Sequence, residues 1–126
     1  MILIFDNELE NNKKPLYNFI NHVNFASYKD NLKQELKIKL FDNRNLFLVT
    51  NPLVNGKKEC EIEDLFTRET LDQKINGKTF SQKDGYNTET HYGKEIFSNY
   101  ISKNYDKINF NGFRKLLDNL NAIIES

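Results

Sequence analysis

Two carboxylates directly follow the first apolar segment of the chain, and their position suits metal chemistry. The segment runs from Met1 to Phe5, and Asp6 and Glu8 come next, separated by Asn7. A pair of carboxylates at the carboxyl end of a strand suits Mg²⁺, a hard cation that takes oxygen ligands. A solvated acidic turn has the same composition, so the spacing alone leaves both interpretations open.

A second acidic group follows the second apolar segment. It consists of Glu61, Glu63 and Asp64, and Glu63 or Asp64 could supply a further carboxylate or a general base. Acidic residues also stabilise the first turn of a helix, which is the simpler interpretation of this group taken alone. We expect oxygens of Asp6, Glu8 and at least one of Glu63 and Asp64 within about 6 Å of a common point, where one hydrated Mg²⁺ could join them.

Lysines beside glycines form a third group that could contact a phosphate. Lys94 follows Gly93, and we assign to Lys94 the stabilisation of charge that develops on a phosphate. The run 77–79, Gly-Lys-Thr, matches the end of a P-loop, but the motif requires glycine where the chain has Asp72, so the nucleotide-binding interpretation fails. Most exposed lysines only keep a protein soluble, which is the alternative for Lys94.

The composition limits the classes of protein that need to be considered. The 126 residues suffice for one domain, residues 1–126, and 38% hydrophobic residues with ten Phe and six Tyr predict a folded chain. Eighteen basic and eighteen acidic residues balance, so no bulk charge attracts nucleic acid. Cys60 is the single cysteine, which excludes an internal disulfide and predicts a cytoplasmic location. No apolar run is long enough to predict a membrane span or a secretory signal.

The elements that must position these residues predict an α/β fold. Continuous apolar runs at 2–5 and 46–50 predict two strands, paired in parallel in a small, partly parallel sheet flanked by helices. Apolar residues at helical spacing predict helices over 15–23, 28–39, 92–101 and 110–124. We expect the last helix to cover the sheet with a stripe that includes Phe113 and Leu117.

Six segments of the chain, taken together and in order, resemble the carboxy-terminal region of some bacterial retron-type reverse transcriptases. They are residues 2–8, 45–53, 60–66, 76–80, 92–97 and 108–113. That region is similar to a Toprim-type domain that follows the polymerase. The resemblance implies a truncated Toprim-like, Rossmann-like fold, Mg²⁺-dependent phosphodiester chemistry of the nuclease type, and a role in antiviral defence. It implies nucleic acid and a reverse transcriptase polymerase domain as partners.

The resemblance also assigns roles to particular residues. In the Toprim superfamily, a D-x-D pair after one strand and a Glu after an earlier strand gather Mg²⁺, and Asp6 and Glu8 match the pair, with Glu in place of the second Asp. The earlier strand and its Glu would precede residue 1. The Y-x-D-D turn of the polymerase has no match, since residues 28–31 read Tyr-Lys-Asp-Asn. We therefore expect a fragment or a split module, with little or no nuclease activity in isolation.

A non-catalytic function is the alternative. The chain could be an interaction module that docks on a reverse transcriptase or on its RNA–DNA product. The balanced charge favours this alternative, whereas the acidic pair at a strand end favours the enzyme.

Overall fold

The computed structural model describes residues 1–22, 26–41 and 45–125, and their fold is mixed α/β with a small, partly parallel sheet flanked by helices, as the sequence predicts. The chain divides into two compact units, one formed by Met1–Leu65 with Phe113–Ser126 and the other by Phe66–Gly112. Each has its own hydrophobic core. That the whole chain is a single domain stays a prediction.

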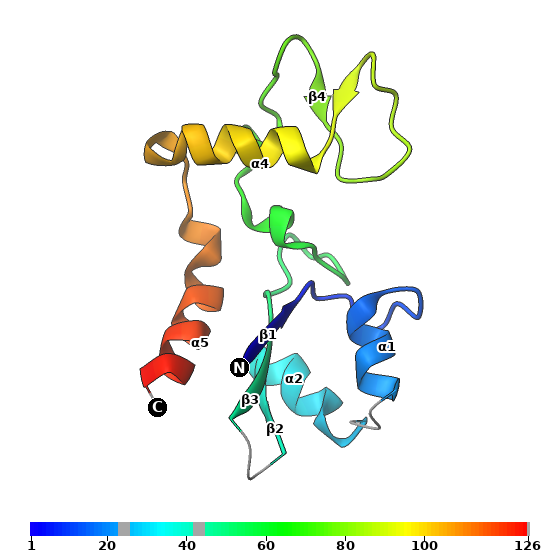
Figure 1. Ribbon diagram of the computed structural model, residues 1–126, viewed down its shortest axis with the longest axis vertical. Coiled ribbons are helices and arrows are strands. Elements are labelled where there is room, and N and C mark those ends of the chain that lie inside the picture. The colour runs from blue at the N-terminus through cyan, green and yellow to red at the C-terminus, as the bar shows by residue number, and fades with distance from the viewer. Residues whose placement is uncertain (23–25, 42–44, 126) are drawn as a thin grey trace. The chain divides into compact units, whose positions relative to one another are not determined.

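The sheet of the first unit has three strands. They are β1 (Ile2–Phe5), β2 (Lys37–Leu40) and β3 (Leu46–Thr50), in the order β1-β3-β2. Strand β1 runs parallel to β3, with Ile2 opposite Phe47 and Phe5 opposite Thr50, and this confirms the predicted parallel pair. The carboxyl ends of β1 and β3 therefore meet at one edge of the sheet (Figure 1).

Helices cover both faces of this sheet. Helices α1 (Pro15–His22) and α2 (Lys29–Glu35) lie on one side, and α5 (Arg114–Glu125) lies on the other (Figure 1). Side chains of neighbouring residues in a strand point to opposite faces. Leu48 of β3 accordingly joins the core beneath α1 and α2, while Val49 joins the core beneath α5. Residue 23, expected in the first helix, lies outside the described residues.

The helix expected over 28–39 is wrong in its second half. Helix α2 ends at Glu35, and β2 follows, paired antiparallel with β3. The physical reason is the left-handed conformation of Leu36, with φ of 62°, which ends the helix and reverses the chain. Beyond it, Ile38 and Leu40 are buried and alternate with lysines, the pattern of a strand with one buried face.

The stripe expected at the end of the chain is right at Phe113, which packs on the core, and wrong at Leu117. Leu116 is buried with Val49 and Leu65, whereas Leu117 is exposed. Phe113 and Leu120 are seven residues apart, and both Leu116 and Leu117 divide this interval into steps of three and four. Either leucine therefore fits the spacing of an apolar helix face. The helix does cover the sheet, as predicted. It begins at Arg114 rather than at residue 110, because Asn111–Phe113 form a 3₁₀ turn. The partly buried apolar residues on this side are Phe113, which ends that turn, and Leu120 and Ile123 of α5.

The second unit contains short elements around an aromatic core. They are α3 (Arg68–Leu71), β4 (Thr79–Phe80), β5 (His91–Tyr92) and α4 (Lys94–Lys103). Strands β4 and β5 pair in parallel. The rings of Phe80 and Phe97 stack with centroids 4.1 Å apart, and Tyr92 is buried beside them. The helix predicted over 92–101 is found as α4, but its predicted start is wrong: the helix begins at Lys94, because Tyr92 belongs to β5.

Candidate functional site

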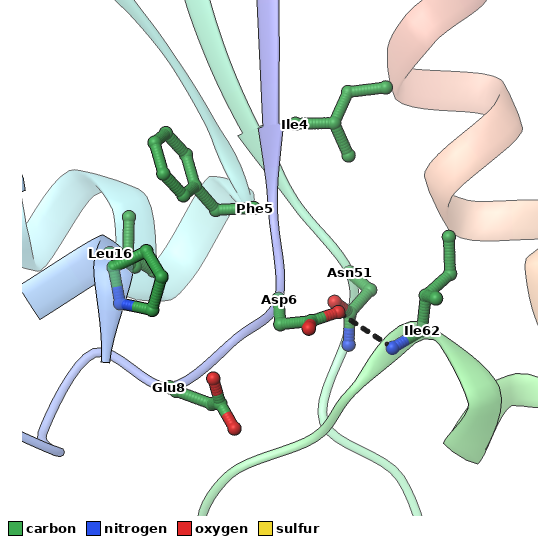
Figure 2. Close-up of a pocket in the computed structure, with 8 residues that line it drawn as sticks. Ile4, Phe5, Asp6, Glu8, Leu16, Asn51 and Ile62 are labelled. Atoms are coloured by element: carbon green, nitrogen blue, oxygen red, sulfur yellow. Dashed lines mark hydrogen bonds between the residues drawn. The ribbon is translucent and has the colours of Figure 1, made fainter. Parts of the chain in front are cut away.

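A pocket of about 440 Å³ opens at the carboxyl ends of β1 and β3 (Figure 2). In open α/β sheets, ligands bind at this end of parallel strands. The strand ends are held together by Thr50 Oγ1, which donates a hydrogen bond of 3.0 Å to the carbonyl oxygen of Phe5. Most of the wall is apolar, and its polar residues are Asp6, Glu8 and Asn51; the others are Ile4, Phe5, Pro15, Leu16 and Ile62.

Asp6 is the first residue after β1, as the sequence predicts. Its Oδ1 accepts a hydrogen bond of 2.8 Å from the backbone N–H of Ile62, the first residue of a 3₁₀ turn over Ile62–Leu65 (Figure 2). Its Oδ2 accepts no hydrogen bond from the described residues. One oxygen therefore fixes the carboxylate on the pocket wall, and the other can still take a ligand.

Glu8 lies beside Asp6 on the pocket wall, and its side chain is only 7% exposed. Lys14 Nζ is 3.5 Å from Glu8 Oε1. Burial raises the pKa of Glu8 above its ordinary value of 4.5; Lys14 lowers the pKa, and the charges of Asp6 and Glu61 raise it again. The charged form of Glu8 is therefore disfavoured in this environment, and a cation near the carboxylates would favour it.

The second acidic group does not complete the site. Asp64 is buried, where its Oδ1 accepts a hydrogen bond of 2.8 Å from Lys57 Nζ and its Oδ2 accepts one of 2.8 Å from the backbone N–H of Glu61. These bonds hold Asp64 within the 3₁₀ turn over Ile62–Leu65, which also contains the half-buried Glu63. Within residues 1–22, 26–41 and 45–125, no three His, Cys, Asp or Glu side chains are grouped to hold a metal ion, so the expected meeting with a third carboxylate is not found there.

Lys94, the predicted phosphate-binding cation, belongs to the second unit. It is the exposed first residue of α4, and Gly93 is the residue that precedes this helix. The assigned role of Lys94 stays a prediction.

Sequence reasoning missed three residues that hold the site together. Asn7 and Cys60 form an isolated antiparallel bridge, with two backbone hydrogen bonds of 2.9 Å. The buried side chain of Asn51 contacts the backbone of both. The sequence signal for Asn51 is its position between a predicted strand and Pro52, and the signal for Asn7 is its position between two carboxylates.

The donor set fits a divalent cation in its chemistry. Carboxylate oxygens are the ligands that Mg²⁺ prefers, and it is commonly held by one or two carboxylates together with substrate phosphates. Asp6 and Glu8 would hold such an ion, and the open pocket leaves room for its remaining ligands.

No protein-family model matches the chain, and no solved structure matches it. None of the helices in the described ranges combines the length and the apolar character that crossing a bilayer requires.

Proposed function

We propose that the chain binds Mg²⁺ through Asp6 and Glu8 and contributes this site to phosphodiester chemistry on nucleic acid. In this proposal it is a Toprim-like carboxy-terminal module of a retron-type RNA-directed DNA polymerase that acts in antiviral defence, with the polymerase domain as its partner. The observation that supports it is the placement of both carboxylates on one pocket at the carboxyl ends of parallel strands.

The residues of the pocket have separable tasks in this chemistry. A bound Mg²⁺ would polarise a phosphoryl oxygen and lower the pKa of a bound water. Asp6 is held in position by the N–H of Ile62 and offers its second oxygen. Glu8 supplies a second charge from a largely buried position, and apolar side chains, including Phe5 and Leu16, line the pocket beside the pair.

Two carboxylates make a weak site. The affinity of a protein for a hard cation depends on the number of charged ligands and on how rigidly they are held. We therefore expect millimolar rather than micromolar binding, and little or no nuclease activity from the 126-residue chain alone.

A second candidate function is a non-catalytic module that docks on a reverse transcriptase or on its RNA–DNA product. It is favoured by the structural partners of both carboxylates, the N–H of Ile62 for Asp6 and Lys14 for Glu8. In this alternative, the two acidic side chains only stabilise the fold.

Titration with Mn²⁺ followed by electron paramagnetic resonance, which measures the free ion, separates the two candidates. The proposal predicts one saturable site that Asp6→Asn abolishes. Asp118→Asn is the matched control, because Asp118 is exposed on α5 and does not line the pocket. Absence of a saturable site in the unaltered chain contradicts the metal proposal.

Incubation with labelled single-stranded, double-stranded and RNA–DNA substrates in Mg²⁺ and in Mn²⁺ then tests the chemistry. Cleavage that disappears with Asp6→Asn would show that two carboxylates suffice. Metal-independent binding of an RNA–DNA duplex, unaffected by Asp6→Asn, would support the docking module.

A further inference from the structure

Asn51 ties together the segments that surround the acidic pair. It follows β3 at the carboxyl edge of the sheet and is 1% exposed. Its Oδ1 accepts a hydrogen bond of 3.1 Å from the backbone N–H of Asn7, and its Nδ2 donates one of 3.1 Å to the carbonyl oxygen of Cys60. One side chain thus connects the segments that follow β1 and β3 with the segment that precedes the 3₁₀ turn.

The residue that Asn51 holds lies between the two carboxylates. The N–H of Glu8 donates a hydrogen bond of 3.0 Å to the carbonyl oxygen of Asp6, which forms a γ-turn with Asn7 at its centre. Asn7 Nδ2 also donates a hydrogen bond of 2.8 Å to the carbonyl oxygen of Asn51, so the two asparagines contact each other reciprocally. Asp6 and Glu8 flank this turn and both line the pocket, and these bonds fix its central residue.

We infer that Asn51 is a positioning residue that sets the spacing of Asp6 and Glu8 for a divalent cation. The inference rests on the proposed function. An amide is needed because it supplies an acceptor for the N–H of Asn7 and a donor for the carbonyl of Cys60. A carboxylate would lose the donor, and an aliphatic side chain would lose both. Removing an outer residue that orients metal ligands typically weakens metal binding about 10- to 100-fold.

The test compares Mn²⁺ affinity in two matched variants. Asn51→Ala removes the positioning contacts and should raise the dissociation constant about tenfold or more. Asn119→Ala is the control, because Asn119 is 3% exposed and donates a hydrogen bond of 3.3 Å to the carbonyl oxygen of Glu35 but does not line the pocket. It should lose thermal stability while keeping the affinity of the unaltered chain within twofold.

The outcomes separate positioning from general stability. A folded Asn51→Ala chain with unaltered affinity overturns the inference, and so does an equal loss of affinity in Asn119→Ala. If Asn51→Ala does not fold, Asn51→Ser decides, because the shorter hydroxyl side chain cannot replace both amide bonds, the one from the N–H of Asn7 and the one to the carbonyl of Cys60. Weaker Mn²⁺ binding in Asn51→Ser supports the inference, and unaltered binding overturns it. If the unaltered chain binds no Mn²⁺, the proposed function itself fails.

Discussion

Two adjacent leucines on α5 test how this helix packs on the sheet. Leu116 is 4% exposed and contacts the core residues Val49 and Leu65, whereas Leu117 is 54% exposed. The two residues have the same chemistry and the same place in the helix, so truncation of each to alanine changes helix propensity equally. The difference between Leu116→Ala and Leu117→Ala therefore measures burial alone.

The expected magnitudes differ by several fold. Removing a buried leucine side chain loses its transfer free energy and leaves a cavity, which together cost about 2 to 5 kcal/mol. The free energy of unfolding of a natural domain is about 5 to 15 kcal/mol, so Leu116→Ala removes a large share of it. An exposed substitution away from special features changes stability by about 0.5 kcal/mol or less, which is our expectation for Leu117→Ala.

Urea unfolding followed by far-ultraviolet circular dichroism measures both values. We expect a clear shift of the midpoint for Leu116→Ala with an unchanged slope, since the slope reports the surface exposed on unfolding. Leu117→Ala should superimpose on the unaltered chain. A larger loss for Leu117→Ala than for Leu116→Ala would refute the packing described for α5 and restore the stripe that the sequence indicated.

Two buried carboxylates of the first unit should respond to substitution in opposite directions. Because the pKa of Glu8 is higher in the folded chain than in the unfolded one, its charged form destabilises the fold near neutral pH, and its contribution to stability rises as the pH falls through its titration. Glu8→Gln should therefore raise the melting temperature at pH 7, with a gain that shrinks towards acid pH; a lower melting temperature at pH 7 contradicts this. Asp64→Ala should lower the free energy of unfolding in urea by about 1.5 to 3 kcal/mol, the range for hydrogen bonds to a charged group, because it removes the bonds from Lys57 and from the N–H of Glu61. Unchanged stability of Asp64→Ala would show that these bonds contribute nothing.

The parallel pair of strands could be predicted because its sequence signal is local and strong. Residues 2–5 and 46–50 are continuous apolar runs that end abruptly in polar residues, as strands covered on both faces do. The structure pairs them in parallel, with helices on both sides of the sheet.

Strand β2 could not be predicted because the apolar residues in this part of the sequence fit both the spacing of a helix and the alternation of a strand. Leu32, Leu36 and Leu40 are spaced as on a helix, yet Ile38 and Leu40 alternate as in a strand. The helix ends because Leu36 adopts the left-handed conformation. This position is usually a glycine, so a leucine there gives no sign in the sequence that the helix stops. On α5, the choice between adjacent leucines depends on the shape of the core and has no local signal.

The two carboxylates of the candidate site could be predicted from the sequence. The residues that hold the surrounding segments in place could not. Asp6 and Glu8 were found from their place after a strand, and the structure puts both on one pocket. The role of Asp64 depends on Lys57 and on a backbone N–H, contacts that only the folded chain shows. Asn7 and Asn51 are two of nineteen asparagines, so their residue type carried no signal.

Paramagnetic broadening by Mn²⁺ in the ¹⁵N-resolved NMR spectrum of the chain tests the central claim most directly, because it locates a bound ion residue by residue. The account predicts that the amide signals of Asp6, Asn7 and Glu8 broaden first and saturably, and that Asp6→Asn removes the effect. Broadening centred on other carboxylates, such as Glu10 or Glu59, or no saturable broadening at all, would contradict the claim that this pocket binds a divalent cation.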